Sequence, residues 1–253
     1  MLYCREPDRM LSDGPLTLKI VTGMHRSGTS LVARLLFESG ADLGDSRLFF
    51  RPDKWNPDGY FEQPDFHAIN MPLINGRVGK LAYFKLPKTE TIIRRSQRFA
   101  DRIRQVAAKY DHCVVKETRF CLTLPAWLRH GTNVSKLLVC LRSPRRVAES
   151  LRKRNKIPIW FGEHLWRVHN ERLFENTRGL DVHVLIYERV TNAQTYLDEL
   201  SRAFQFMQMP LEPARLKALC ADKIRFTAPD EVREPLVEKR LAGNLWERWM
   251  QYR

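Results

Sequence analysis

The sequence predicts an α/β fold, a doubly wound parallel sheet of four to five strands with helices on both faces. Four short apolar segments support this prediction, at residues 17–22, 112–116, 136–141 and 182–187. Near-continuous apolar runs of this kind are typical of strands that are buried on both faces of a sheet. Amphipathic helical patterns separate the segments, and this alternation is typical of parallel sheets.

The first apolar segment leads through a turn bracketed by Gly23 and Gly28 into a helix that opens at Thr29. Glycine permits a tight bend and the close approach of a ligand to the backbone. The helix N-terminus offers unpaired N–H groups and the positive end of the helix dipole, which together bind anions. Gly23 to Ser30 reads G-x-x-x-x-G-T-S, the spacing of a phosphate-binding P-loop with threonine in place of lysine. The sheet is therefore expected to be P-loop-like.

The cation of this turn lies inside it, at Arg26 beside His25. A nucleoside triphosphatase needs the P-loop lysine and a magnesium ion held by a carboxylate. The missing lysine argues against that activity. A kinase with a degenerate P-loop, with Glu117 or Glu188 as its magnesium ligand, is the rival interpretation.

Helical patterns follow at residues 65–74, 91–110, 160–178 and 192–204. The second of these predicts one amphipathic helix with a basic outer face. The strand at residues 112–116 ends in the charged run K-E-T-R. In a doubly wound sheet, strand ends of this polarity face the ligand crevice.

The third apolar segment ends at Arg142, and Ser143 and Pro144 follow as the N-cap and first residue of a helix. Ser150 lies about two helical turns further on, on the same helix face as the cap. Arg142 and Ser150 are therefore expected to hold one anion together. The alternative is that Arg142 is a surface charge and Ser150 a solvated helix residue.

The two motifs resemble those of sulfotransferases that use 3′-phosphoadenosine 5′-phosphosulfate (PAPS). The H-R-S-G-T-S-L run is similar to the arginine-bearing 5′-phosphosulfate loop of that family, and R-x-P-x-x-V-x-x-S is similar to its 3′-phosphate site. The resemblance covers about residues 19–206 and implies PAPS binding without a metal. The residues implied in binding are His25, Arg26, Ser27, Gly28, Thr29, Ser30, Arg142 and Ser150.

The same resemblance suggests catalytic residues. Glu62 ends an N-P-x-G-Y-F-E segment similar to one in bacterial sulfotransferases, and it matches the general base of the tyrosylprotein branch. Glu117 and His25 are the other candidate bases. Lys116, in a run similar to the family's K-D-P-R segment, would neutralise the transferring group together with Arg26. The competing interpretations are a helix cap for Glu62 and a structural ion pair for Lys116 or Glu117.

The remaining resemblances point to scaffold. Tyr187 and Glu188 resemble a segment that follows a strand in the family.

We interpret residues 1–253 as a single domain, with a core at about 17–206 and a C-terminal helical extension at about 207–253. No apolar run approaches the roughly 18 residues of a membrane span, so a cytoplasmic location is expected. The five cysteines show no metal-binding spacing.

The formal charge of +14 predicts a positive field that gathers anions. The expected activity is transfer of a sulfuryl group from PAPS to an acceptor hydroxyl, with a saccharide, acidic or neutral, as the preferred acceptor. A peptide tyrosine or a small-molecule alcohol are alternatives. A nucleic-acid-binding module is the non-enzymatic alternative, but no recognition-helix, zinc or aromatic-platform motif supports it.

Overall fold

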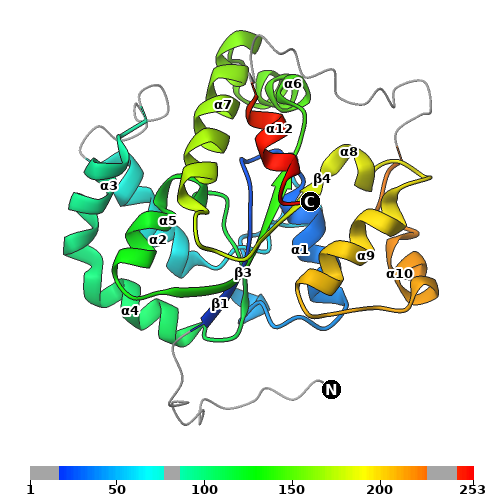
Figure 1. The fold of residues 1–253 in the computed structure, drawn as a ribbon, viewed down its shortest axis with the longest axis horizontal. Coiled ribbons are helices and arrows are strands. Elements are labelled where there is room, and N and C mark those ends of the chain that lie inside the picture. The colour runs from blue at the N-terminus through cyan, green and yellow to red at the C-terminus, as the bar shows by residue number, and fades with distance from the viewer. Residues whose placement is uncertain (1–16, 77–85, 227–243) are drawn as a thin grey trace.

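A computed structural model describes residues 17–76, 86–226 and 244–253. Its centre is a parallel four-stranded sheet with the order β2-β1-β3-β4 (Figure 1). The strands are β1 (Thr17–Thr22), β2 (Val114–Lys116), β3 (Asn133–Leu141) and β4 (Val182–Ile186). The predicted α/β fold and its four apolar segments are confirmed.

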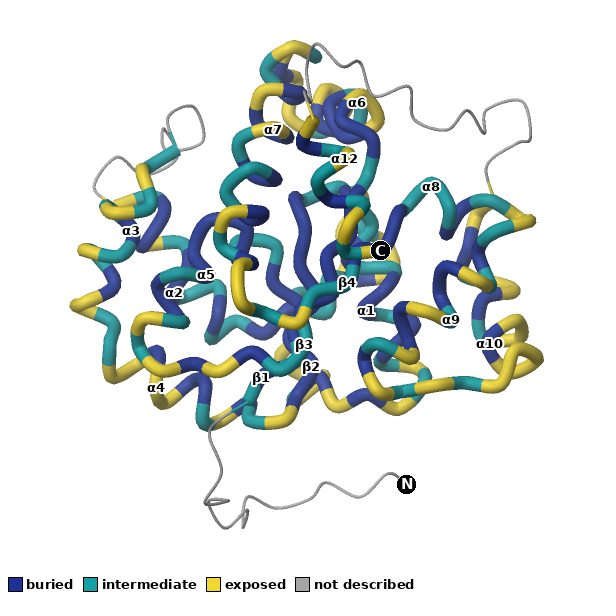
Figure 2. The backbone as a smooth tube through the Cα atoms, in the orientation of Figure 1, coloured by how far each residue is buried: buried dark blue, intermediate teal, exposed yellow. Residues whose placement is uncertain are grey.

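Each strand sends alternate side chains into two hydrophobic cores, because successive residues of a strand point to opposite faces. In β3, Leu137 and Val139 lie in one core, whereas Leu138 and Cys140 lie in the other. Figure 2 shows the strands as a mostly buried layer between helices. Burial on both faces explains why these segments read as continuous apolar runs.

Helices cover both faces of the sheet, as the sequence predicts. The first core receives side chains from α2 (Pro64–Asn75), α3 (Thr89–Ser96), α4 (Ala100–Lys109), α5 (Phe120–Arg129), α6 (Pro144–Asn155), α7 (Ile159–Asn176) and α12 (Leu245–Met250). The second core receives them from α1 (Thr29–Glu38), α8 (Tyr187–Val190), α9 (Tyr196–Phe206) and α10 (Pro213–Cys220). The arrangement is therefore doubly wound.

The prediction of one helix over residues 91–110 is wrong. A 3₁₀ turn, Gln97–Phe99, separates α3 from α4. The Ser96 hydroxyl donates to the Ile93 carbonyl oxygen (2.7 Å) and lies 2.9 Å from His130 Nε2. Serine side chains that bond the preceding turn in this way compete with regular helix geometry.

The strand order places a ligand crevice beside β1. The chain passes from β1 to the edge strand β2 and then crosses to β3 on the opposite side of β1. Ligands of open α/β sheets bind outside the carboxyl ends of the strands, where the order reverses. The ends of β1 and β3, which carry the two predicted anion motifs, flank this point.

The C-terminal residues pack against the core. The Val184 N–H in β4 donates to the Tyr252 carbonyl oxygen (2.9 Å), and Trp249 is fully buried. Residues 227–243 of the predicted extension lie outside the described residues. Within the described ranges, no helix combines the length and apolar character that a membrane crossing requires.

Candidate active site

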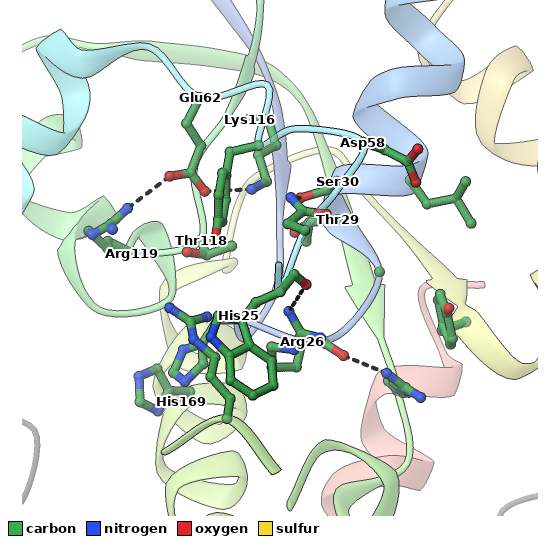
Figure 3. A pocket seen from close by; sticks show the side chains of 18 of the residues that line it. His25, Arg26, Thr29, Ser30, Asp58, Glu62, Lys116, Thr118, Arg119 and His169 are labelled. Atoms are coloured by element: carbon green, nitrogen blue, oxygen red, sulfur yellow. Dashed lines mark hydrogen bonds and ion pairs between the residues drawn. The ribbon is translucent and has the colours of Figure 1, made fainter. Parts of the chain in front are cut away.

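A cavity of about 1140 Å³ opens at the carboxyl ends of the strands, between the turn after β1 and helices α2, α5 and α7. Figure 3 shows its centre, with His25 and Arg26 near Thr29 and Ser30 and with Glu62 between Arg119 and Lys116. Eight arginine or lysine side chains and two carboxylates line it among the described residues. Such a cavity concentrates anions, because low-dielectric walls focus the field of its charges.

The turn between β1 and α1 fits tightly against its neighbours. Gly28 is the N-cap of α1 at φ 88°, and a Cβ atom there would lie 2.1 Å from the Tyr187 ring. A Cβ at Gly23 would lie 2.3 Å from the Cys140 carbonyl oxygen in β3. Only glycine allows this approach, so both glycines of the motif fix the turn at the cavity wall.

An alanine in the left-handed conformation ordinarily costs about 1–3 kcal/mol. Gly28→Ala is expected to lower the free energy of unfolding by more than this, because the added methyl group overlaps the Tyr187 ring. Thermal unfolding would measure the loss. Gly131→Ala is the matched control, since Gly131 has the same φ of 88° and nothing within 4 Å of its Cβ position. Equal losses in the two variants would contradict the tight contact with Tyr187.

Arg26 lies in the turn at φ 74°, a left-handed conformation. Its Nε donates to Ser150 Oγ (2.8 Å) and its Nη1 to the Trp55 carbonyl oxygen (3.1 Å). Burial, followed by repulsion from Arg154 and Arg142, lowers the pKa of Arg26. Three guanidinium groups that repel one another in one cavity would be stabilised by an anion bound among them.

Arg142 reaches the same turn from the end of β3. Its Nη1 donates to the Arg26 carbonyl oxygen (2.9 Å), and its guanidinium lies 4.5 Å from the centre of the Tyr187 ring. The Trp166 indole N–H donates to the Arg142 carbonyl oxygen (2.8 Å). Arg142 Nε is buried and has no hydrogen-bond partner among the described residues, so this donor is unsatisfied, a condition that is rare in folded proteins.

The predicted partnership of Arg142 and Ser150 takes an indirect form. Arg26 lies between them, because its side chain donates to Ser150 and its carbonyl oxygen accepts from Arg142. Ser143 is the N-cap of α6 and Pro144 its first residue, as predicted, but the Ser143 side chain makes no cap bond. Its N–H donates instead to Glu188 Oε1 (2.9 Å).

Of the two residues that the sequence interpretation assigned to scaffold, Tyr187 lines the cavity. Glu188 does not line it and accepts from the Ser143 N–H, next to Arg142, which is consistent with a scaffold role. Burial raises the pKa of Glu188. Their position directly after β4 was the available signal, since the carboxyl ends of parallel strands meet at one edge.

Glu62 forms ion pairs with two cationic side chains that line the cavity. Glu62 Oε1 lies 2.5 Å from Lys116 Nζ, and Oε2 lies 3.3 Å from Arg119 Nη1. Burial acts to raise the pKa of this carboxyl, but attraction to the two cations outweighs it and the pKa lies below its usual value. The helix-cap interpretation is wrong, because the N-cap of α2 is Gln63. Glu62 is thus an ionised carboxylate that lines the cavity.

Glu117 lies away from the cavity. It is completely buried, accepts from Arg119 Nη1 (2.8 Å), and is absent from the lining. Burial raises its pKa. The expected structural pair therefore exists between Glu117 and Arg119, and the position of Glu117 disfavours it as the base.

His25 lines the cavity beside His169, with ring centres 5.6 Å apart in an edge-on arrangement. Burial, followed by the neighbouring His169, holds the pKa of His25 well below its usual value. Burial also lowers the pKa of His169 to about 4, while its Nδ1 lies 2.7 Å from the Leu165 carbonyl oxygen. Both rings are neutral at pH 7, so His25 keeps a lone pair that makes it a second candidate base.

No protein-family model matches this chain, and no curated protein matches its sequence. Several solved structures resemble it, including the following three. The sulfotransferase domain of the Synechococcus PCC 7002 olefin synthase is 16% identical, over 95% of this chain and 90% of that one, with a TM-score of 0.49. The sulfotransferase domain of the curacin biosynthetic pathway is 17% identical, over 95% and 93%, with a TM-score of 0.41. Retinol dehydratase, solved with androsterone and the inactive cofactor PAP, is 13% identical, over 96% and 80%, with a TM-score of 0.44.

Proposed function

We propose that this protein is a sulfotransferase that moves a sulfuryl group from PAPS to an acceptor hydroxyl. One observation carries the proposal: two anion-binding elements on adjacent strands are joined by the hydrogen bond from Arg142 Nη1 to the Arg26 carbonyl oxygen. One element is a helix N-terminus, and the other is an arginine whose buried Nε has no partner in the part of the chain that the structure describes. This arrangement suits a nucleotide with two phosphate-type groups.

The residues present fit such a nucleotide. The N–H groups of residues 27–30 would hold the 5′-phosphosulfate at the start of α1, where the helix dipole favours negative charge. Arg142, aided by Ser150 and the Arg26 side chain, would hold the 3′-phosphate. Stacking of Arg142 on Tyr187 fixes the guanidinium before the ligand arrives, which lowers the ordering cost of binding.

The chemistry requires positioning and charge stabilisation more than covalent work by the protein. PAPS supplies the sulfuryl group, which forms a bond to the acceptor oxygen as its bond to the 5′-phosphate breaks. Glu62 would accept the proton of the acceptor hydroxyl, with His25 as the alternative base. Arg26 and Lys116 would stabilise negative charge on the leaving phosphate and on the transferring group.

The cavity carboxylates favour this activity over ATP-dependent phosphoryl transfer. Asp58 pairs with Arg34 (2.8 Å), and Glu62 pairs with Lys116 and Arg119. Thr29 also stands where a P-loop kinase carries lysine. Arginine and lysine would thus supply the positive charge for sulfuryl transfer.

Calorimetric titration with 3′-phosphoadenosine 5′-phosphate (PAP), 5′-AMP and ATP, each with and without EDTA, tests the proposal. PAP is expected to bind at least about tenfold more tightly than 5′-AMP, because the 3′-phosphate adds charge-assisted hydrogen bonds. EDTA should leave PAP binding unchanged. A preference for ATP that EDTA abolishes would overturn the proposal and favour the kinase.

A further inference from the structure

Helices α6 and α7 form a helical hairpin beyond the carboxyl ends of the strands (Figure 1). α6 ends at Asn155, α7 begins at Ile159, and residues 156–158 make the turn between them. We call residues 152–161 the hairpin tip. It borders the cavity, because Arg154, Asn155 and Ile157 belong to the cavity lining.

The hairpin tip is held in place from its inner side. Ile157 is buried in the first core. Gly162, the residue after the tip, packs so closely on α6 that a Cβ atom there would lie 2.8 Å from Ala148 Cα. The Lys156 N–H closes the turn by donating to the Arg152 carbonyl oxygen (3.0 Å). A surface that is ordered before its partner arrives loses less conformational entropy on binding.

The outer side of the hairpin tip carries three exposed cations, Arg152, Lys153 and Lys156. The nearest carboxylates along the chain are those of Glu149 and Glu163. Both contact an arginine in the first turn of α6, at 3.3 and 3.5 Å. None of the three exposed cations forms an ion pair within the described residues. Their charge is therefore available to an anionic partner.

An exposed apolar surface adjoins these cations. Trp160 is 67% exposed, more than any other large hydrophobic side chain in the described ranges. Pro158 beside it is exposed and Ile159 is half-buried. The Trp160 ring contacts the Phe161 ring edge-on, with centres 5.6 Å apart. Tryptophan next to lysine and arginine is typical of protein surfaces that lie at the interface between a membrane and water.

We infer that the hairpin tip docks on the surface of a bilayer that contains anionic lipids. Trp160 and Pro158 would enter the headgroup region, and the exposed cations would contact lipid headgroups. A soluble acidic polymer could pair with the cations, but it would bury less of the apolar side chains at the end of the hairpin. Docking would also bring the cavity close to the lipid surface. The inference does not depend on the proposed function.

Sedimentation of the full chain with lipid vesicles at physiological ionic strength tests the inference. The vesicles contain phosphatidylcholine alone or phosphatidylcholine mixed with phosphatidylserine. We expect the mixed vesicles to bind at least about tenfold more tightly, since each lysine or arginine near an anionic surface adds about fivefold in affinity. Equal affinity for the two kinds of vesicle, or no binding to either, would overturn the inference.

Charge variants separate the hairpin tip from the general positive charge of the chain, which is +14. The double variant Arg152→Gln/Lys153→Gln is expected to weaken binding to the mixed vesicles by about 25-fold. Arg98→Gln/Arg102→Gln is the matched control, because it removes the same charge from two exposed residues outside the tip. Its loss should stay below about threefold. Equal losses in the two variants would overturn the assignment to the tip.

Trp160→Ala tests whether the partner is a bilayer. It is expected to weaken binding to the mixed vesicles by about tenfold, because it removes the apolar side chain that would enter the headgroup region. Leu48→Ala is the matched control, since Leu48 is exposed to 46% and lies outside the tip. Unchanged vesicle affinity in Trp160→Ala would overturn the bilayer in favour of a soluble acidic polymer. Thermal unfolding of each variant shows that it is folded.

Discussion

Glu62→Gln is expected to lower kcat by about 10²- to 10⁴-fold, the usual contribution of a positioned general base. Glutamine keeps the size of the side chain and an acceptor oxygen for Lys116, but it cannot take up the acceptor proton. PAP affinity should stay within about threefold of the original value. Steady-state kinetics with PAPS and an acceptor hydroxyl compound, combined with PAP calorimetry, would separate the loss of chemistry from a loss of nucleotide binding.

Glu117→Gln is the matched control for this experiment. It makes the same chemical change in a carboxylate that also contacts Arg119 but does not line the cavity. Its effect on kcat should stay below about tenfold. Near-normal turnover of Glu62→Gln, together with a large loss of kcat in His25→Asn, would show that His25 is the general base instead of Glu62.

Arg142→Ala is expected to weaken PAP binding by about 100-fold, equivalent to roughly two charge-assisted hydrogen bonds. Binding of 5′-AMP, which has no 3′-phosphate, should weaken much less. The tenfold or greater preference for PAP over 5′-AMP should therefore disappear in this variant. Calorimetry with both nucleotides measures the two affinities directly.

Arg146→Ala controls for the lost positive charge. Arg146 is an exposed residue of α6, which begins shortly after Arg142, and it does not line the cavity. Its replacement should change PAP affinity by less than about threefold, because exposed charges are screened by solvent and salt. An Arg142→Ala variant that keeps its preference for PAP would contradict the assignment of Arg142 to the 3′-phosphate.

The fold was predictable because its signals are local. Each of the four strands contains a short, near-continuous apolar run. The turn after β1 carries glycine where the backbone approaches Tyr187 and Cys140 most closely. The structure places Arg142 beside this turn, as the common edge of parallel strand ends allows. These features need no knowledge of how distant side chains meet.

The partners of individual side chains were less predictable. Glu62 is 54 positions away from Lys116, so only the folded chain shows that the candidate base and the candidate cation contact each other. Ser150 meets Arg26 instead of Arg142 for the same reason. Ser96, at the break between α3 and α4, approaches a histidine 34 positions further on, a contact that the local sequence does not reveal.

The contact between Arg142 and the turn uses a main-chain atom, the Arg26 carbonyl oxygen. No side-chain substitution at position 26 removes that acceptor, and the Tyr187 ring touches both Gly28 and Arg142. Changes at these positions should therefore show strong epistasis, because residues in one contact network do not contribute additively. Directed evolution of this site toward another nucleotide would require paired substitutions, one in the turn after β1 and one near Arg142. A single substitution in one of these elements would also disturb the other.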